Sequence, residues 1–361
     1  MKRDPVCKME LYEELAIVYE LNGENFYFCS EGCRDKFLIE HPEGSERSTY
    51  ELIIVGGGPA GLTAAVYAAT MKIDTFVLTK DLGGQAFDST KIENYMGYDF
   101  ITGPELIQKF KDQLIHSHYV DHLITEVERI ELNSNEFEVT TSELRSFTSK
   151  ALIVATGMRR RKLNLPGEER FQRKGIFYGN IQDYSFVQGK DVAVVGGGNS
   201  ALQIVEKLHT VADKLHLISE FELTADPLLI ERIGAYPKLK RYENTKVIRF
   251  LGNGVISGIE IRKKASSDTS ILPVRGVFVS IGLEPSSGLV ADFVDLNKKR
   301  EIVVDAQCRT SVPGLFAAGD VTNAFGKRIV IASGEGAKAA LSARTHILEL
   351  REKKRHSIQS G

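Results

Sequence analysis

The sequence has few cysteines, few prolines and no long apolar run, and these shortages restrict the class of protein that it can encode. It has four cysteines and ten prolines in 361 residues. The cysteines are unevenly placed, which favours metal binding or redox chemistry over a disulfide framework. No apolar run reaches the length of a transmembrane helix. The formal net charge of −2 gives no strong field that would favour nucleic acid or an anionic membrane.

The first 14 residues are charged and contain no apolar core of a secretory signal, so we expect a cytoplasmic protein. The length allows two or three domains with hydrophobic cores. The 32 glycines suit an α/β fold with many tight turns between strands and helices.

The chain is organised around residues 51–69, ELIIVGGGPAGLTAAVYAA, where an apolar strand precedes a G-x-G-x-x-G turn and a helix of small residues. In such a turn the first glycine permits the bend, the second admits a pyrophosphate and the third lets the helix pack on the strand. The free amides at the helix start face the phosphates. The predicted contacts are Gly56, Gly58, Pro59, Ala60 and Gly61.

A second copy of the pattern follows at residues 191–208, DVAVVGGGNSALQIVEKL. Two such turns predict two bound nucleotides, and the usual pair is a flavin and a nicotinamide. The alternative is one dinucleotide-binding domain and a coincidental glycine cluster. The predicted contacts of the second nucleotide are Gly196, Gly198, Asn199, Ser200 and Ala201.

The first 47 residues gather three of the cysteines, Cys7, Cys29 and Cys33, at C-x21-C-x3-C spacing. We expect strands at 15–21 and 25–29, joined by an Asn-Gly turn, and a helix at 31–40. Thiolates brought together in this way suit zinc or copper(I). His41 is a candidate fourth ligand. A redox dithiol at Cys29 and Cys33 and incidental buried thiols remain alternatives.

This segment resembles the YHS (TRASH-like) metal-binding module. The resemblance rests on the sequence DPVC with Met9, on YFCSEGC at residues 27–33 and on Phe37. It implies a small metal-binding domain, followed by a linker near residues 43–48.

Residues 48–350 resemble the thioredoxin reductase family, and from residue 213 onward they most resemble the flavoprotein subunit of alkyl hydroperoxide reductase. The shared features are a Gly-Gly-Gln turn, Glu-Asn-Tyr at residues 93–95, an Ala-Thr-Gly turn and a strand ending in Gly-Asp. The resemblance implies FAD contacts at Gly84, Gln85, Asn94, Thr156, Gly157, Gly319 and Asp320, with Asp320 bound to the ribityl chain.

Arg328 and Ile329 begin the last predicted helix, and by the same resemblance they face the pyrimidine edge of the flavin. Relatives tend to have glutamine where Arg328 stands. A cation there would stabilise a reduced, anionic flavin. The alternative is an arginine that faces solvent or pairs with a carboxylate.

The predicted strand at residues 214–219 ends next to Glu220, with Glu222 close behind. A carboxylate there can accept hydrogen bonds from the adenosine ribose and repels a 2′-phosphate. NADPH-specific relatives carry a histidine and two arginines where this chain has Ser219, Glu220 and Phe221. We therefore expect NADH to be preferred over NADPH. The alternative is that these carboxylates are only solvated loop charges.

One stretch departs from the family. The resemblance places a C-x-x-C-D motif at residues 179–183, but Gly179 and Gln182 stand at the cysteine positions and only Asp183 remains. Neither residue can form a disulfide or a thiolate. Reduction of disulfides by the family's route is therefore excluded, and we assign Asp183 no role.

The sequence predicts an α/β protein with two Rossmann-like three-layer dinucleotide-binding domains and a small N-terminal module. The expected FAD domain is split by the expected NAD(P)H domain, and hinges are expected near residues 158–163 and 280–285. The predicted bounds are 1–47 for the YHS-like module, 48–160 and 283–350 for the FAD domain, 163–280 for the NAD(P)H domain and 351–361 for a polar tail.

We expect an FAD-dependent NAD(P)H oxidoreductase, by resemblance a homodimer, that uses no active-site disulfide. The acceptor is expected to be a ferredoxin-like protein, a metal ion or a quinone. The alternatives are a non-catalytic redox sensor that binds flavin and metal, and a disulfide reductase that uses Cys29 and Cys33.

Overall fold

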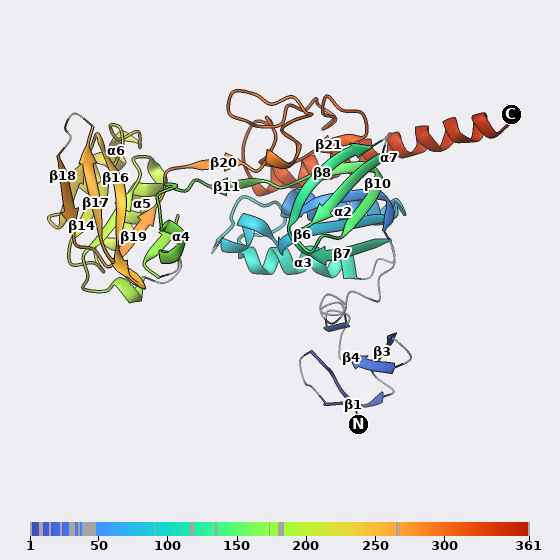
Figure 1. Ribbon diagram of the computed structural model, residues 1–361, viewed down its shortest axis with the longest axis horizontal. Helices are drawn as coiled ribbons and strands as arrows, with labels where there is room; N and C mark the ends of the chain where they lie inside the picture. The colour runs from blue at the N-terminus through green and yellow to red at the C-terminus, as the bar shows by residue number, and fades with distance from the viewer. Residues whose placement is uncertain are drawn as a thin grey trace. The chain divides into compact units, whose positions relative to one another are not determined.

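The computed structural model describes residues 2–6, 10–13, 16–21, 24–28, 33–34, 37, 48–89, 91–115, 119–133, 136–172, 174–179, 184–264, 266 and 268–359 (Figure 1). The chain divides into a first unit, Met1–Gly157 with Pro285–Gly361, and a second unit, Met158–Glu284. The second unit is inserted in the first, as the sequence predicts for the nicotinamide domain. The first 47 residues fall in the first unit, so their independence as a module stays a prediction.

The first unit is built on one mixed sheet. Its strands are β5 (Thr49–Gly57), β6 (Thr75–Leu82), β7 (Val120–Ile124), β8 (Val127–Asn133), β9 (Glu136–Thr141), β10 (Ser146–Val154) and β21 (Leu315–Ala317). The order is β7-β6-β5-β10-β9-β8, and β21 pairs with the end of β10. β7, β6, β5, β10 and β21 run parallel, whereas β8 and β9 add an antiparallel hairpin. This parallel order is that of a nucleotide-binding α/β domain.

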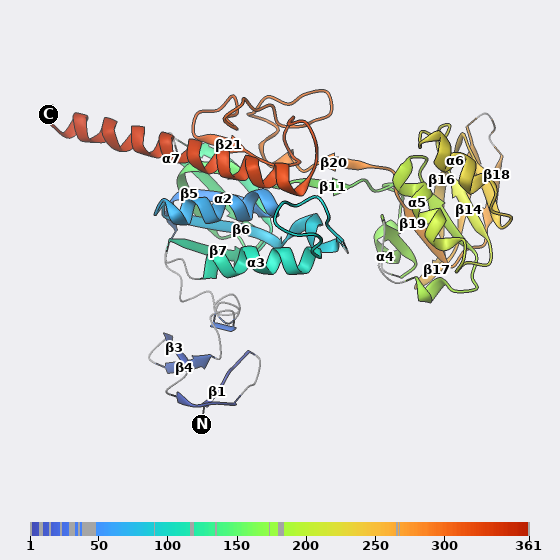
Figure 2. The same ribbon diagram turned by 180° about the vertical axis from the view of Figure 1, so that it is seen from behind.

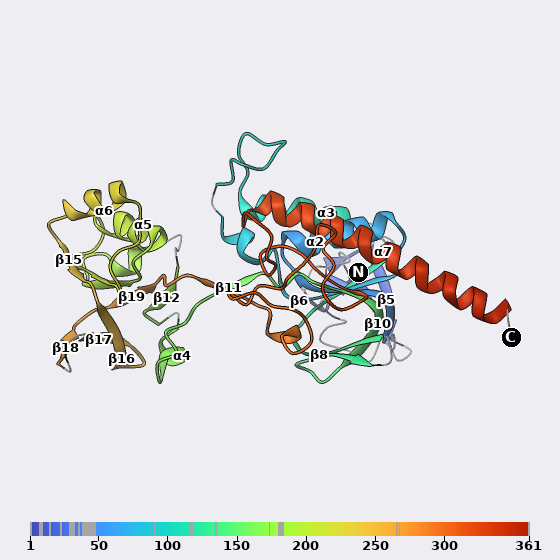
Figure 3. The same cartoon turned by 90° about the horizontal axis from the view of Figure 1, so that it is seen from above.

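Helices cover one face of this sheet. They are α2 (Pro59–Thr70), α3 (Gly103–Ile115) and α7 (Ile329–Gln359), and the short turn η3 (Gly84–Asp88) precedes α3. From behind, α2 and α7 lie side by side across the strands (Figure 2), and from above α3 lies in the same layer (Figure 3). The close approach of α2 and α7 depends on small buried residues: Ala60, Ala64, Ala65, Ala68, Ala339, Ala340 and Ala343.

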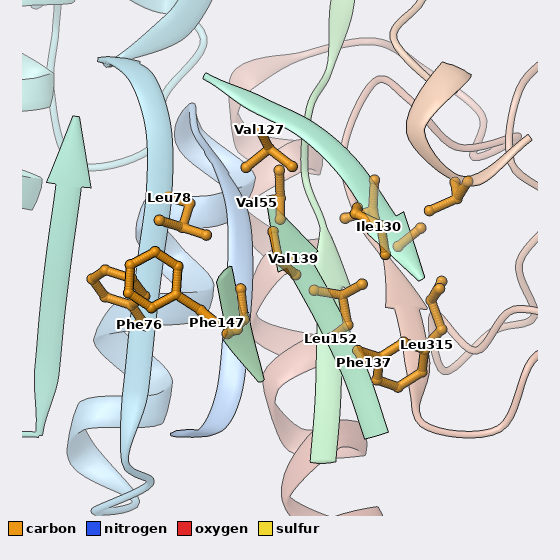
Figure 4. Packing of buried hydrophobic residues seen from close by; sticks show 14 of the residues in the cluster. Val55, Phe76, Leu78, Val127, Ile130, Phe137, Val139, Phe147, Leu152 and Leu315 are labelled. Carbon is orange, nitrogen blue, oxygen red and sulfur yellow. The ribbon is translucent and has the colours of Figure 1, made fainter. Parts of the chain in front are cut away.

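Side chains alternate along β5, as the period of a strand requires. Leu52 and Ile54 pack under the helices, whereas Ile53 and Val55 pack on the opposite face. Figure 4 shows the cluster on that opposite face, where the rings of Phe76, Phe137 and Phe147 lie among aliphatic side chains from several strands. The segment around η5 (Gly288–Val290) covers this cluster. The predicted three-layer arrangement is therefore confirmed.

The second unit has a parallel sheet and an antiparallel one. The parallel order is β12-β19-β13-β14-β15, and the antiparallel order is β16-β17-β18. The strands of these sheets are β12 (Ile176–Tyr178), β13 (Val192–Val195), β14 (Leu215–Ile218), β15 (Leu239–Tyr242), β16 (Thr245–Asn253), β17 (Val255–Lys263), β18 (Thr269–Leu272) and β19 (Gly276–Val279). A separate pair, β11 (Met158–Arg160) and β20 (Leu283–Pro285), lies at the boundary of the unit. Its helices are α4 (Glu168–Phe171), η4 (Ser185–Val187), α5 (Asn199–Leu208) and α6 (Pro227–Gly234).

Both predicted hinges coincide with paired strands, because β11 and β20 form a strand pair. The backbone N–H of Arg161 donates to the carbonyl of Gly282 at 3.1 Å. The Arg159 guanidinium donates to Glu284 Oε1 at 2.7 Å. The chain entering the second unit is thus held to the chain leaving it. Motion about this pair stays a prediction.

The N-terminal segment contains the predicted hairpin, with slightly different bounds. Its strands are β1 (Lys2–Arg3), β2 (Glu10–Leu11), β3 (Ile17–Leu21) and β4 (Glu24–Phe28), and β3 pairs antiparallel with β4. Phe28 and Phe37 are buried, and their ring centroids lie 5.2 Å apart. The predicted helix at 31–40 lies mostly outside the described residues.

Helix α7 runs past residue 350, the predicted end of the FAD domain, and continues through most of the predicted polar tail to Gln359. Residues 351–359 are mostly charged or polar but contain neither glycine nor proline, so nothing in the sequence ends the helix. Arg351 on this extension forms an ion pair with Glu51 at the start of the sheet. Within the described residues, no helix is both long enough and apolar enough to cross a membrane.

Two glycines of α7 provide a matched test of the helix packing. A Cβ on Gly336 would lie 2.0 Å from the carbonyl oxygen of Ala60, whereas a Cβ on Gly334 would meet nothing within 4 Å. We expect Gly336→Ala to destabilise the first unit by about 1–3 kcal/mol through overpacking. Gly334→Ala should stabilise it by about 0.5–1 kcal/mol through lower backbone entropy of the unfolded chain. Thermal unfolding of the two variants measures both, and equal effects would contradict the packing described.

Candidate functional site

The first glycine turn joins β5 to α2, and its glycines lie in close contact with neighbouring backbone atoms. Gly56 has φ +114°, and a Cβ on it would lie 2.3 Å from the carbonyl oxygen of Ala155. A Cβ on Gly61 would lie 1.8 Å from the carbonyl oxygen of Gly56. A side chain on Gly61 would push the start of α2 away from the end of β5, and one on Gly56 would push that end away from Ala155, which follows β10. These two glycines therefore fix the position of the helix start.

Gly58 is the residue of this turn that faces open space. It precedes α2 in an extended conformation, no side chain caps the helix, and an added Cβ would meet no atom within 4 Å. Pro59 occupies the first turn, which contains no acidic residue. The described part of the chain thus leaves the first amides of α2 open to an anion. This geometry fits the pyrophosphate of a dinucleotide.

The Gly-Gly-Gln turn lies against the same place. Gly84 has φ +53°, and a Cβ on it would lie 3.3 Å from the Cα of Gly58. Its N–H donates to Asp81 Oδ1 at 2.9 Å, which holds the turn to the end of β6. Gln85 and Asn94 are both exposed. Their predicted contacts with FAD stay predictions.

The sequence analysis missed Asp81. This carboxylate stands near the end of the second parallel strand, twenty positions after Gly61 (81 − 61). That spacing is the usual signal for a carboxylate that binds the ribose of a dinucleotide, so it could have been found. One of its oxygens is engaged by the turn.

Thr156 and Gly157 lie in the turn that follows β10, the strand paired with β5 on the side away from β6. The hydroxyl of Thr156 donates to the carbonyl of Ser286 at 2.8 Å, and the N–H of Ser286 donates to the carbonyl of Gly157 at 2.9 Å. Gly157 has φ +64° with no atom within 4 Å of an added Cβ. The turn is therefore anchored on one side and open at its glycine.

Asp320 follows β21 in a turn packed against α2. Gly319 has φ +79°, and a Cβ on it would lie 2.8 Å from the Cβ of Ala60. Asp320 is half-buried, and burial raises the pKa of its carboxyl, while nearby Lys327 lowers it and Glu335 raises it further. The turn thus holds the Asp320 carboxyl close to the start of α2, and its contact with FAD stays a prediction.

The buried side chain of Glu335 on α7 holds this turn by hydrogen bonds, and the sequence analysis did not predict Glu335. Its side chain is buried, and Oε2 accepts hydrogen bonds from the N–H of Gly319 at 2.9 Å and from the hydroxyl of Thr322 at 3.2 Å. A buried carboxylate is stable only where such donors satisfy it. Its signal in the sequence was a lone glutamate among the small residues of the last helix.

Arg328 and Ile329 lie at the start of α7. Ile329 packs beside Leu62, Ala86 and Ile107. Arg328 is exposed, and its Nη1 donates to the carbonyl of Lys327 at 2.9 Å. Both the flavin-facing role of Arg328 and the solvent-facing alternative therefore stay open.

The second glycine turn repeats the geometry of the first. Gly196 has φ +142°, and a Cβ on it would lie 2.1 Å from the carbonyl oxygen of Ser280 and 3.1 Å from the Cβ of Ala201. Gly198 precedes α5 without any side-chain cap, and the nearest atom to an added Cβ is 3.9 Å away. The start of α5 therefore also fits a pyrophosphate.

Two predicted contacts in this turn differ in their surroundings. The amide of Asn199 donates to Asp226 Oδ2 at 2.8 Å and accepts from the N–H of Asp226 at 2.7 Å. Both polar atoms of its side chain are thus used to join the starts of α5 and α6. Ser200 is exposed on the first turn of α5.

Glu220 lies in the turn after β14, and its neighbour there was not predicted. Its Oε1 is 3.6 Å from the ammonium of Lys264, and both side chains are partly exposed. The same ammonium lies 3.6 Å from the centroid of the Phe221 ring. A cation therefore accompanies the carboxylate predicted to select the nucleotide.

The predicted metal ligands fall mostly outside the described residues. Cys7 and Cys29 are not described, and Cys33 is half-buried. Among the residues that are described, no group of three histidine, cysteine or acidic side chains could hold a metal ion. Cys308 lies elsewhere, fully buried in the first unit, and burial raises the pKa of its thiol to about 11. A thiol of this kind is a poor nucleophile and a poor ligand.

Gly179 is the part of the divergent stretch that the structure describes, because residues 180–183 lie outside it. Gly179 has φ +71°, and the guanidinium of Arg160 fills the space beside it: an added Cβ would lie 1.8 Å from Nη1. A side chain at this position would need Arg160 to move.

Glu335 gives a test of the Asp320 turn. Glu335→Ala leaves the buried N–H of Gly319 without its acceptor and takes one of two acceptors from the Thr322 hydroxyl, so we expect binding of FAD to weaken about tenfold. Glu335→Gln keeps an acceptor oxygen and should restore most of the affinity. Titration of the flavin-free chain with FAD measures both. Equal losses in the two variants would contradict a hydrogen-bonding role.

Comparison with known proteins agrees with the two nucleotide-binding turns and with the N-terminal cysteine pattern. Residues 50–341 match the family described as "Pyridine nucleotide-disulphide oxidoreductase", and residues 3–44 match the YHS domain. The first match covers both glycine turns, and the second covers all three N-terminal cysteines.

Curated relatives match over most of this chain. An alkyl hydroperoxide reductase component of Pseudomonas putida is 36% identical over 309 residues, which cover 84% of this chain and 59% of the relative. The NADH dehydrogenase of Bacillus subtilis (strain 168) is 34% identical over 309 residues, 85% of this chain and 60% of the relative. The chain thus spans about three fifths of the length of these relatives.

Solved structures with the same fold include thioredoxin reductases. The thioredoxin reductase of Lactococcus lactis matches with a TM-score of 0.70 and 30% identity, over 83% of this chain and 99% of that chain. The thioredoxin reductase of T. acidophilum matches with a TM-score of 0.67 and 30% identity, over 83% and 99%. The chain therefore belongs to the pyridine nucleotide-disulphide oxidoreductase family, with a thioredoxin-reductase-like fold and an N-terminal YHS domain.

Proposed function

We propose that this chain oxidises NADH with FAD and passes the electrons to an acceptor without an active-site disulfide. The observation that carries the proposal is the pair of open helix starts. In each, glycines hold the helix against its strand, and among the described residues no side chain caps the first amides. One such start suits the pyrophosphate of FAD and the other that of NADH.

In this proposal the two helix starts and the residues around them bind and orient the two nucleotides. The start of α2 binds the FAD pyrophosphate, and Gly84 and Gly157 leave room beside it. Asp320 accepts a hydrogen bond from the ribityl chain, and Glu335 holds the turn that positions it. In the second unit the start of α5 binds the NADH pyrophosphate, and Glu220 binds the ribose. Bound FAD would supply the acceptance of a hydride and the onward transfer of electrons.

The absence of a sulfur relay rests on the sequence and on the surroundings of Gly179. Glycine and glutamine stand where the family resemblance places the redox cysteines, and the Arg160 guanidinium fills the space beside Gly179. Cys308 is too buried and too weakly acidic to replace them. Two curated relatives of this chain are named NADH dehydrogenases, which supports NADH as the reductant.

The acceptor is proposed only by class: a ferredoxin-like protein, a quinone or a metal ion held at the YHS domain. A redox sensor is the second candidate. In a sensor of this kind, binding or release of a metal at the YHS domain would report the redox state of the flavin. The retained second glycine turn favours the enzyme, since a sensor has no need of NADH. A homodimer belongs to the same proposal.

Anaerobic reduction by NADH tests the route of the electrons. We expect NADH to bleach the flavin, with NADPH less effective, while the number of free thiols stays constant, because no disulfide lies between NADH and the acceptor. Thiol titration of the denatured protein before and after reduction gives the count. A gain of thiols on reduction would contradict the proposal, and Cys29→Ser would then show whether Cys29 is responsible.

Metal analysis tests the N-terminal cysteines separately. We expect zinc or copper(I) to bind the purified chain, and Cys29→Ser with Cys33→Ser to abolish that binding, because both thiolates are proposed ligands. Cys308→Ser is the matched control and should keep the metal. FAD content should be equal in all variants. Metal retained by the double variant would exclude these ligands.

A further inference from the structure

Lys264 is anchored beside the turn that follows β14. It comes directly after β17, and its backbone N–H donates to the carbonyl of Asn244 at 2.7 Å. Asn244 in turn lies between β15 and β16. Neighbouring strands thus fix the backbone of Lys264, and its side chain needs only to reach across to the turn.

The ammonium of Lys264 has two contacts in that turn. It lies 3.6 Å from the centroid of the Phe221 ring, a cation–π geometry that holds a cation over the ring face. It also lies 3.6 Å from Glu220 Oε1. Phe221 and Glu220 are both exposed, so a ligand can reach the ammonium and the carboxylate together.

The neighbouring charges of this turn are placed differently. Glu243 accepts from the N–H of Leu223 at 3.3 Å and pairs with Arg241, so its carboxylate is already engaged. Glu222 is exposed to solvent. Two pairs of opposite charge thus flank the turn, and the carboxylate is the more exposed in the Lys264–Glu220 pair: the Glu220 side chain is 54% exposed, whereas that of Glu243 is 28% exposed.

We propose that Lys264 is a specificity-determining residue, whose ammonium offsets the Glu220 carboxylate and lets the site accept a 2′-phosphate. The inference rests on the proposed function, in which this turn binds the adenosine ribose. A carboxylate alone would repel the phosphate. An ammonium within 4 Å of that carboxylate lies at nearly the same distance from a 2′-phosphate bound at the turn, and it attracts the phosphate where the carboxylate repels it. The chain then uses NADH first and NADPH as a weaker second reductant.

The experiment compares two probes that differ only in the 2′-phosphate: 5′-AMP and adenosine 2′,5′-bisphosphate. Calorimetric titration of the full FAD-loaded chain gives both dissociation constants. We expect Lys264→Met to weaken binding of the bisphosphate about tenfold and that of AMP less than about twofold. Lys263→Met, one position earlier on an exposed part of β17, is the matched control for charge and should change neither.

The Glu220 variant completes a double-mutant cycle. Glu220→Gln should strengthen binding of the bisphosphate about tenfold while Lys264 is present, and this gain should largely disappear in the Glu220→Gln, Lys264→Met double variant. High salt should reduce the effect of Lys264→Met, since both side chains are partly exposed.

The outcomes separate this inference from the proposed function. Equal losses for both probes in Lys264→Met, or the same loss in Lys263→Met, would overturn the role of Lys264 while leaving the nucleotide site intact. Failure of AMP to bind the parent chain would overturn the nucleotide site itself, and the role of Lys264 with it.

Discussion

The structure depends on backbone contacts that only glycine allows. A Cβ on Gly61 would lie 1.8 Å from the carbonyl of Gly56, and one on Gly336 would lie 2.0 Å from the carbonyl of Ala60. Because these side chains are missing, α2 starts directly at the end of β5 and α7 crosses directly over α2. The same constraint recurs in the second unit, where Gly196 lies against the carbonyl of Ser280. The close approaches at Gly61 and Gly196 lie beside the starts of α2 and α5, which no described side chain caps, and these open helix starts are the chemical feature of the fold.

Polar side chains then secure what the glycines bring together. Asp81 holds the Gly84 turn, and buried Glu335 holds the turn that carries Asp320. In the second unit Asn199 joins the starts of two helices through Asp226. These side chains satisfy backbone donors in the turns and helix starts that surround the two open amide groups. A nucleotide site of this kind is prearranged before any ligand binds.

The sequence predicted the fold and both glycine turns, because strand, glycine spacing and helix all lie within about twenty residues of one another. It could not predict Glu335, Lys264 or the Arg160 contact with Gly179, because each is a side-chain contact between different elements, and no residue spacing along the chain signals such a contact. The double use of Asn199 was missed for the same reason: its partner is on another helix. The predicted polar tail at residues 351–361 is helical as far as Gln359, since polar composition alone does not stop a helix. Cys7 and Cys29 lie outside the described residues, so their role remains a prediction.

The central claim is that electrons leave the flavin without a sulfur pair. The most direct measurement is single-turnover transfer from NADH through FAD to an artificial one-electron acceptor in a chain that has no cysteine at positions 7, 29, 33 and 308. Equal FAD content in the variant and the parent is the condition for the comparison. The account predicts the same rates of flavin reduction and reoxidation in both chains. Loss of reoxidation with flavin reduction intact would contradict it and would assign the exit of electrons to a thiol.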